Sequence, residues 1–412
     1  MDVEKLLGEM TIQEKVGQMF LLAFSGNRLD EAQVLMEENM VGAAYISNEN
    51  VPTPEAAYGL TTKLGQFAGN TRLQVPLVLG VDQEGSWSVM YPGSSPGPGN
   101  MAVGATGDPD MAYKMYEVIG KELRAVGLNT LLAPCADCNS NPVNSIIGMR
   151  SFGEKSGLVG QMTAAAVRGA HAGGVIATPK HFPGHGDTLQ DSHRDLPTVS
   201  RSAEDLYTID LHPFAEGIRA GAGMVMTAHI IFSALDPDNP ATLSSVILND
   251  VLRDQMGFDG VVLSDSMNMM AMKRHYDPKE SAVQAFLAGV DLLMLAEEHY
   301  DHNAEQYLAN QQALIEAAIE ANASGTLPTA RIDEAVRRVL TLKAKSDLTL
   351  APPVDKEEAI HIVGSDAHRN VELEVATAAV SILRNRKGLL PLDARQKILL
   401  VNTTTRKSYE PL

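Results

Sequence analysis

Basic residues are scarce in this sequence. Its 33 Lys and Arg residues stand against 51 Asp and Glu residues, which gives a formal net charge of −18 and an isoelectric point near 5.0. Nucleic acids and anionic lipid surfaces bind basic proteins, so this charge excludes nonspecific nucleic-acid binding and docking on anionic membranes. The sequence also contains no Walker loop, dinucleotide fingerprint or DNA-reading motif.

Long apolar segments are missing as well. No uninterrupted run of apolar residues is long enough to cross a membrane. The first residues, MDVEKLLGEMTIQEK, place acidic side chains where a signal peptide needs a basic flank and an apolar run. We therefore expect a cytoplasmic protein with no membrane partner.

Cysteine is nearly absent. The only two cysteines, Cys135 and Cys138, form a single C-x-x-C pair in LLAPCADCN. A zinc site would need further ligands, and a redox motif follows a different strand context. We expect both thiols to fill apolar positions near a strand end, and we expect neither a metal nor a cofactor.

Apolar runs recur along the chain with little alternation. There are eight of them, at residues 16–24, 41–47, 76–82, 129–137, 174–182, 223–230, 260–265 and 291–296. Continuous apolar runs are typical of strands that are buried on both faces, as in parallel sheets. Helical patterns separate them, so the sequence predicts a (β/α)8 barrel, with a doubly wound open sheet as the alternative.

The helical patterns also divide the chain. Apolar residues at helical spacing predict helices at 3–15, 110–127, within 154–174 and at 331–345. We expect the barrel to occupy 1–345 and a Pro- and Asp-containing linker to follow at 346–365. Residues 366–412 would then form a helix over 366–383 and the start of a second α/β domain, which includes the strand-like run KILLVN.

The stretch KHFPGHGDTLQDSHRDLP, residues 180–197, has the richest chemistry. It contains three histidines and three aspartates, and it follows an apolar run. Gly184, Gly186 and Pro183 prevent a helix and predict a loop that bends sharply. So many titratable groups on a loop at a strand end favour a catalytic site over an ordinary solvated loop.

The central element of this loop is Asp191-Ser192-His193. A carboxylate two residues from a histidine can hold one ring nitrogen, which leaves the other to give or take a proton. The alternative is that Asp191 only caps a turn. The glycines further predict a loop that is mobile without ligand, so that His193 can lie away from the rest of the site.

The whole stretch resembles the signature of the N-acetylglucosaminidase branch of family-three glycoside hydrolases. In that branch the loop after barrel strand five carries lysine-histidine, a glycine-rich turn and then Asp-Ser-His. The resemblance implies a retaining enzyme that releases terminal β-linked N-acetylglucosamine, for example from cell-wall fragments, and acts on carbohydrate alone. It implies that His193 is the general acid and base, oriented by Asp191.

The resemblance also assigns the other site residues. Asp265, in GFDGVVLSDSMNMMAM, would be the nucleophile that forms a glycosyl-enzyme ester. The sugar hydroxyls would be bound by Asp82, Arg150, Lys180 and His181. For Lys180 and Arg150 the alternative is an ion pair with neighbouring aspartates. We expect His229 to be a packed, hydrogen-bonded histidine.

One segment departs from the family. Members usually continue DQEGG with an arginine, whereas this chain reads DQEGSWSVM, with Ser86, Trp87 and Met90. A basic contact is lost and an aromatic surface that can stack on a second sugar is gained. Several alternatives stay open: a phosphorylase on the same scaffold, a β-glucosidase-like enzyme, a non-catalytic sugar-binding barrel and a metal-dependent hydrolase.

Overall fold

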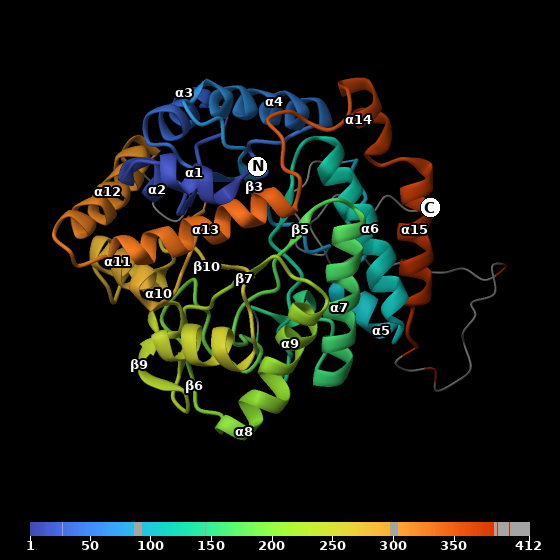
Figure 1. Ribbon diagram of the computed structural model, residues 1–412. Helices are drawn as coiled ribbons and strands as arrows, with labels where there is room; N and C mark the ends of the chain where they lie inside the picture. Colours follow the sequence, from blue (N-terminus) through green and yellow to red (C-terminus); the bar gives the residue numbers. More distant parts are fainter. Residues whose placement is uncertain are drawn as a thin grey trace. The chain divides into compact units, whose positions relative to one another are not determined.

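The computed structural model describes residues 1–26, 28–85, 93–144, 146–296 and 304–382, together with Asn385 and Arg395. The chain divides into two units, Met1–Ala379 and Val380–Leu412. Within the described ranges, every helix and strand lies in the first unit (Figure 1). The segments DQEGSWSVM beyond Gly85 and KILLVN lie outside the described residues.

Each of the eight predicted apolar runs contains a short parallel strand. Six of these strands form one sheet in the order β11–β1–β2–β3–β4–β5, and β10 pairs with β7 in a second sheet. The strands are β1 (Phe20–Leu22), β2 (Ala43–Tyr45), β3 (Val78–Val81), β4 (Thr130–Leu131), β5 (Ile176–Ala177), β7 (Met224–Met226), β10 (Val261–Leu263) and β11 (Leu293–Leu295).

Single bridges connect the two sheets at both junctions. Phe182, just beyond β5, pairs with Thr227, just beyond β7, and Leu263 of β10 pairs with Leu292, just before β11. Because only one residue pair meets at each junction, the described strands do not form one continuous closed sheet. The predicted α/β class with a parallel sheet is confirmed, whereas the regular pairing does not close a barrel.

The strands are buried on both faces, which explains why their sequences are apolar throughout. Side chains of a strand point alternately to opposite faces. Leu21 of β1 therefore joins one hydrophobic cluster while Phe20 and Leu22 join another. Val262 of β10 likewise belongs to a different hydrophobic cluster from its neighbours Val261 and Leu263.

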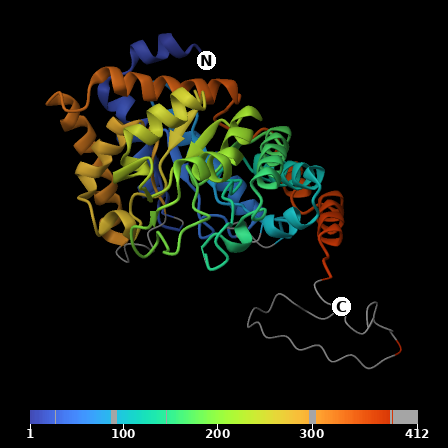
Figure 2. The ribbon, with the colours of Figure 1, turned by 90° about the horizontal axis from the view of Figure 1, so that it is seen from below.

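Helices alternate with these strands and surround them (Figure 2). The α-helices are α1 (Val3–Glu9), α2 (Ile12–Gly17), α3 (Leu29–Gln33), α4 (Pro54–Asn70), α5 (Asn100–Ala105), α6 (Pro109–Ala125), α7 (Ser156–Ala172), α8 (Ala203–Asp205), α9 (Leu211–Arg219), α10 (Met270–Lys273), α11 (Pro278–Ala288), α12 (Ala304–Ala323), α13 (Thr329–Lys345), α14 (Lys356–Ile362) and α15 (Asp366–Ala378).

Shorter elements complete the chain. Three segments are π-helical and two are 3₁₀-helical: η1 (Val34–Glu38), η3 (Leu206–Asp210), η5 (Val246–Gln255), η2 (Gly148–Arg150) and η4 (Ala241–Leu243). A small third sheet, in the order β6–β8–β9, consists of β6 (Thr198–Val199), β8 (Ile231–Phe232) and β9 (Asp236–Pro240). It follows directly on the 180–197 stretch.

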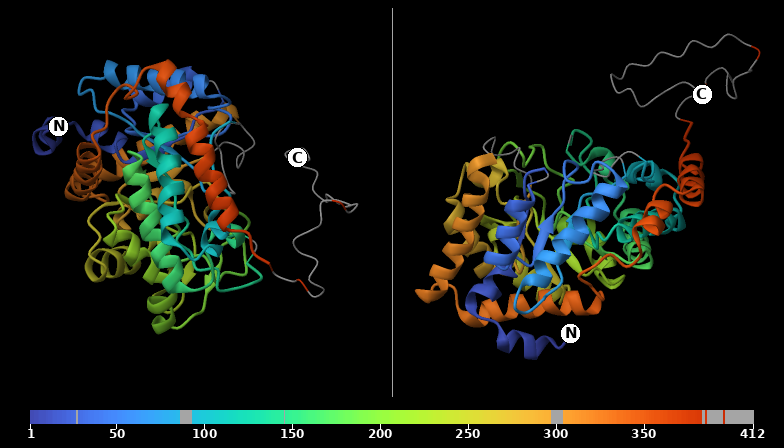
Figure 3. Two further views of the ribbon diagram at one scale, coloured as in Figure 1. Left: turned by 90° about the vertical axis from the view of Figure 1, so that its right-hand side faces the viewer. Right: turned by 90° about the horizontal axis from the view of Figure 1, so that it is seen from above.

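Two helix predictions need correction. The pattern at 3–15 forms two helices, because Thr11 and Glu14 make a capping box that starts α2 anew. The helix predicted at 366–383 ends at Ala378, and the described residues after it are not helical. The stretch expected to be a linker contains α14, and α15 packs on α6 (Figure 3).

Helix α13 covers the amino-terminal ends of the strands. Lys343 Nζ donates to the carbonyl of Gly42, just before β2, at 2.9 Å. A side chain at Gly223, just before β7, would lie within 2.8 Å of Leu342. The loops that follow the strands lie at the opposite end (Figure 3, right). The polar strand-end residues therefore belong to the end that α13 leaves uncovered.

One buried carboxylate organises the α13 end. Asp291 is fully buried before β11, and its two oxygens contact Arg253 at 2.5 Å, Arg331 at 2.9 Å and Arg338 at 3.3 Å. It also accepts from the backbone N–H of Val262 at 3.0 Å. This carboxylate links α13 to β10 and to η5.

We expect Asp291→Asn to destabilise the protein by roughly 3–5 kcal/mol, because it leaves three partly buried guanidinium groups without their shared anion. Urea unfolding followed by circular dichroism measures the effect. Asp259→Asn is the matched control, because Asp259 is 96% exposed and contacts Arg338 only at 3.7 Å. Equal unfolding midpoints for the two variants would contradict this account.

Candidate active site

Polar side chains follow the carboxyl ends of several parallel strands. Asp82 and Glu84 follow β3, Asp137 follows β4, Lys180 follows β5 and Asp265 follows β10. Carboxyl ends of parallel strands meet at one edge, which is where α/β proteins place their sites. These side chains form the polar rim of the fold, a name we use for them and the residues that contact them.

A network of buried charges forms one side of the polar rim. The Lys180 ammonium pairs with the carboxylate of Asp82 and, at 2.6 Å, with that of Glu84. Arg150 donates to both oxygens of Glu84, at 2.7 and 2.9 Å. Asp82 also accepts from the Tyr45 hydroxyl at 3.0 Å. Lys180 is therefore ion-paired with an aspartate, as the alternative interpretation expected, whereas the carboxylate that pairs with Arg150 is a glutamate.

The opposite charges in this network keep each other ionised although the groups are buried. Burial acts to raise the pKa of Glu84, but the charges of Arg150 and Lys180 outweigh it and hold that pKa well below its ordinary range. Burial acts to lower the pKa of Lys180, but Asp82 and Glu84 raise it above its ordinary range. The polar rim thus presents fixed cations and anions at neutral pH, which suits hydrogen bonding to sugar hydroxyls.

Asp137 is the common partner of two histidines. It contacts Nδ1 of His181 at 2.8 Å and accepts from the backbone N–H of His185 at 2.6 Å. Burial acts to raise the pKa of Asp137, but the charge of His181 and these hydrogen bonds lower it. With Nδ1 held by a carboxylate, Nε2 of His181 faces Arg150, whose Nη2 lies 3.4 Å away.

Asp191 and His193 form a close pair. One oxygen of Asp191 contacts Nδ1 of His193 at 2.8 Å and accepts the backbone N–H of His193 at 2.9 Å. The His193 side chain is 36% exposed, so it can reach a ligand from this position. Because the carboxylate holds Nδ1, proton exchange with a ligand falls to Nε2.

Asp265 lies among the histidines of the polar rim. Its carboxylate accepts the backbone N–H of Ser266 at 2.8 Å. Burial acts to raise the pKa of Asp265, but the charges of His181, His229 and His193 outweigh it, and the pKa falls below its ordinary value. The three histidines follow two strands, β5 and β7, and together they keep this one carboxylate ionised.

His229 is packed and hydrogen-bonded, as predicted. Its Nδ1 contacts the Thr242 hydroxyl at 2.8 Å, and its Nε2 lies 3.0 Å from the carbonyl of Ser266. Since a carbonyl only accepts, Nε2 donates and the ring is held next to Asp265. Burial lowers the pKa of His229.

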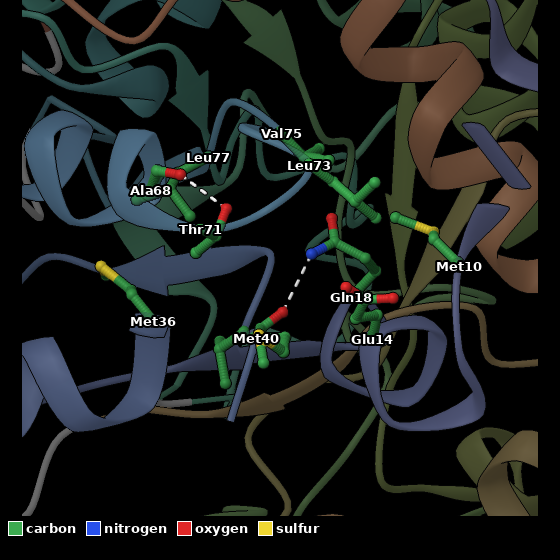
Figure 4. Close-up of a pocket in the computed structure, with 11 residues that line it drawn as sticks. Met10, Glu14, Gln18, Met36, Met40, Ala68, Thr71, Leu73, Val75 and Leu77 are labelled. Atoms are coloured by element: carbon green, nitrogen blue, oxygen red, sulfur yellow. Dashed lines mark hydrogen bonds between the residues drawn. The ribbon is translucent and has the colours of Figure 1, made fainter. Parts of the chain in front are cut away.

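The small cavity shown in Figure 4 lies elsewhere, beside α2, η1 and α4. Its volume of about 20 Å³ holds roughly one water molecule, far less than a sugar ring needs. Gln18, which lines it, donates to the carbonyl of Met40 at 2.9 Å. We therefore place the candidate site at the polar rim.

Comparison with known proteins identifies the family. Residues 11–342 match the family described as the glycosyl hydrolase family 3 N-terminal domain. The chain belongs to glycosyl hydrolase family 3. This membership confirms the family that the 180–197 stretch indicated.

Several family-3 proteins are similar to the chain over most of its length. Beta-hexosaminidase A of Pseudoalteromonas piscicida is 33% identical, over 92% of this chain and 65% of its own length. Beta-hexosaminidase of Xylella fastidiosa is 33% identical, over 75% of this chain and 92% of its own. The chain thus spans about two thirds of the first relative and nearly all of the second.

A solved structure shares the fold. The glycoside hydrolase family 3 beta-N-acetylglucosaminidase from Paenibacillus sp. str. FPU-7 has a TM-score of 0.81 and 37% identity, covering 90% of this chain and 69% of its own. The beta-glucoside phosphorylase BglX has a TM-score of 0.84 but 25% identity, covering 95% of this chain and 69% of its own. These similarities agree with the predicted glycosidase.

Sequence analysis missed three residues of this family-3 site. The first two are Glu84, which pairs with Arg150 and Lys180, and Asp137, which contacts the His181 ring and the backbone of His185. Asn100, at the start of α5, donates to the backbone carbonyl of Arg150 at 2.7 Å and accepts from Tyr116. Their position after β3 and β4 was the only signal, because their partners are distant in sequence.

Three donor atoms of this site cluster as metal ligands do. Cys135, Asp137 and His181 each offer one ligand atom, and these atoms lie within 4.8 Å of one another. The thiol of Cys135 lies 3.1 Å from the same Asp137 oxygen that His181 Nδ1 contacts. Burial and the Asp137 charge raise the pKa of Cys135 well above its ordinary value, so a hydrogen-bonded thiol suits these contacts.

No helix in the described part of this family-3 chain is both long and apolar enough to span a membrane.

Proposed function

We propose that the chain is a retaining glycosidase that releases terminal β-linked N-acetylglucosamine, with Asp265 as nucleophile and His193 as general acid and base. The observation that carries this proposal is the 2.8 Å contact between Asp191 and His193, on the same rim as an ionised Asp265. Family-3 membership and relatives named beta-hexosaminidase and beta-N-acetylglucosaminidase support it.

The proposed reaction has two steps. In the first, the Asp265 carboxylate attacks the anomeric carbon, the bond to the leaving oxygen breaks, and Nε2 of His193 gives that oxygen its proton. In the second, His193 takes a proton from water, which attacks the same carbon and releases Asp265. In both steps Asp191 holds Nδ1 of the ring, so that Nε2 carries out the proton transfer.

We further propose that Asp82, Lys180, Arg150 and His181 bind the sugar. Asp82 accepts hydroxyl protons, while Lys180 and Arg150 donate to hydroxyl oxygens from their ion-paired positions. The partly exposed Asp82 carboxylate and the buried Lys180 ammonium support this division. Bound sugar would share donors and acceptors with the existing ion pairs, so no charge is left uncompensated.

We also infer that the eight parallel strands enclose one core as a (β/α)8 barrel. One hydrophobic cluster contains Leu21, Val78, Ile176, Met224, Val261 and Met294, which come from six different strands. The single bridges at Phe182–Thr227 and Leu263–Leu292 lie where the two sheets would join. A barrel would place all the strand-end residues around one opening.

Phosphorolysis is the second candidate. Glycosidases usually pair two carboxylates, and a histidine in place of one lets phosphate approach without anionic repulsion. The likeness to BglX, named a beta-glucoside phosphorylase, supports keeping this alternative. It uses the same Asp265 and His193, with phosphate in place of water.

The substrate class is tested with a panel of p-nitrophenyl glycosides, with and without phosphate. We expect turnover of the N-acetyl-β-glucosaminide and little turnover of the β-glucoside. If phosphate raises the rate and the product is a sugar phosphate, phosphorolysis replaces hydrolysis. Cleavage of the β-glucoside alone would reject the substrate proposed here.

Asp265→Ala should lower kcat by several orders of magnitude while leaving the fold intact, because it removes the nucleophile at the rim and no core side chain. Because Asp265 must be ionised and its pKa is lowered, the acid limb of kcat/KM should lie below the ordinary aspartate value of about 3.9. Circular dichroism at each pH separates this limb from unfolding. A variant with more than about a tenth of the activity would remove Asp265 from the role.

Asp191→Asn keeps the side-chain shape but replaces the carboxylate that contacts Nδ1 of His193. We therefore expect a lower kcat/KM on substrates whose leaving group needs a proton, because the ring is no longer held by an acceptor of the same charge. Asp195→Asn is the matched control, because Asp195 lies in the same loop and pairs with His275 instead. Unchanged kcat/KM on such substrates in both Asp191→Asn and His193→Ala would rule out this pair as the acid.

A further inference from the structure

His185 has no part in the site assigned so far, although it lies in the middle of the 180–197 stretch. Its side chain is almost fully buried. Its backbone N–H donates to Asp137 at 2.6 Å, which ties it to the end of β4. The ring nitrogens reach two hydroxyls, those of Thr188 and Ser192, at 2.8 and 3.0 Å. Every polar atom of the ring is therefore engaged inside the loop.

The surrounding donors determine which way these hydrogen bonds run. The Thr188 hydroxyl donates to the carbonyl of His185 at 3.1 Å, so its oxygen receives the Nδ1 proton of the ring. Burial lowers the pKa of His185 to about 4, so the ring is neutral at physiological pH. Nε2 then carries a lone pair and accepts the hydroxyl proton of Ser192.

Ser192 stands between the two residues of the proposed acid pair, Asp191 and His193. Its side chain is held by His185, and its carbonyl accepts the backbone N–H of Ala271 at 3.2 Å. Ala271 lies in α10, in the segment that follows Asp265, and that segment is joined to β11 by Met267 N–H to the Met294 carbonyl at 2.9 Å. Ser192 therefore touches both halves of the proposed catalytic apparatus.

We propose that His185 is a positioning residue that sets His193 opposite Asp265 by holding the hydroxyl of Ser192. The proposal rests on the proposed function, since it takes His193 to be the acid. Asp137 extends the arrangement to the sugar side, because the same carboxylate holds His181. The buried Asp137 carboxylate thus positions residues for both sugar binding and proton transfer.

A misplaced His193 should affect some substrates more than others, depending on the leaving group. Cleavage of a glycoside with an alkyl or sugar leaving group needs a proton, whereas a dinitrophenolate leaves without one. A variant that displaces the acid should lose activity on the first substrate and keep most of it on the second. A variant that merely loosens the fold should lose both alike.

The test compares Ser192→Ala, His185→Asn and His185→Gln on di-N-acetylchitobiose and on 2,4-dinitrophenyl N-acetyl-β-glucosaminide. The asparagine amide reaches the Nδ1 position only, whereas glutamine reaches the Nε2 position and can still accept from Ser192. We expect Ser192→Ala and His185→Asn to lower kcat/KM for the disaccharide about tenfold more than for the dinitrophenyl substrate. For His185→Gln, the kcat/KM values on the two substrates should lie closer to those of the unaltered protein.

Ser281→Ala is the matched control. Ser281 is equally buried, and its hydroxyl bonds the carbonyl of Pro278 within α11, away from the rim. It should change the two substrates alike. If His185→Asn does not fold, Ser192→Ala still decides the question, because it removes one hydroxyl and leaves the backbone contacts.

The outcomes separate this proposal from the function on which it rests. If His193→Ala shows the leaving-group dependence but Ser192→Ala does not, His185 has no positioning role and the acid assignment stands. If His193→Ala itself treats both substrates alike, the acid assignment fails, and the role of His185 fails with it. Equal losses on both substrates in Ser192→Ala would indicate a purely structural role.

Discussion

A single buried carboxylate, that of Asp137, supports the arrangement of the whole polar rim. It receives backbone and ring contacts from His181 and the backbone N–H of His185, at 2.6 to 3.2 Å. Removing an ionised carboxylate from water costs several kcal/mol unless hydrogen bonds replace its hydration. Its hydrogen bonds therefore constrain the turn that carries His181 and His185, because the backbone N–H groups of both residues donate to this carboxylate.

The other buried charges of the polar rim also depend on partners that replace their hydration. Glu84 is buried with Arg150 and Lys180, and each charge is compensated by its neighbours. Such a network contributes little net stability compared with apolar packing, because desolvation offsets most of the attraction. Its value is geometric: it holds two cations and two carboxylates ready at the strand ends, where a polar ligand can bind without reorganisation.

The two ends of the strands use buried charge differently. At the α13 end, Asp291 is enclosed by three arginines, all its contacts are internal, and the effect is to fasten helix and strands together. At the opposite end, Asp82 and His193 keep part of their surface exposed, while Lys180, the partner of Asp82, is buried. Exposed functional groups on buried supports are what a site needs to meet a ligand without losing its shape.

Several features of this protein follow from its sequence alone. Apolar runs that lack alternation predicted the parallel strands, because both faces of such strands are covered. The family and the close Asp191–His193 pair were also predictable, since both depend on residues near each other in the chain. The limits of the helices were less predictable. Apolar spacing continues through residues 3–15, but the Thr11–Glu14 capping box divides this stretch into two helices.

Only the tertiary structure decided which distant groups meet. Glu84 and Arg150 are 66 residues apart, and Asp137 and His181 are 44 residues apart, so no local pattern couples them. The lowered pKa of Asp265 depends on histidines that follow two other strands, β5 and β7. The contact between His185 and Ser192 depends on how the 180–197 loop folds back on itself. Chemical type and local spacing are properties of the chain, whereas the electrostatic environment of a buried group depends on every neighbour that folding brings to it.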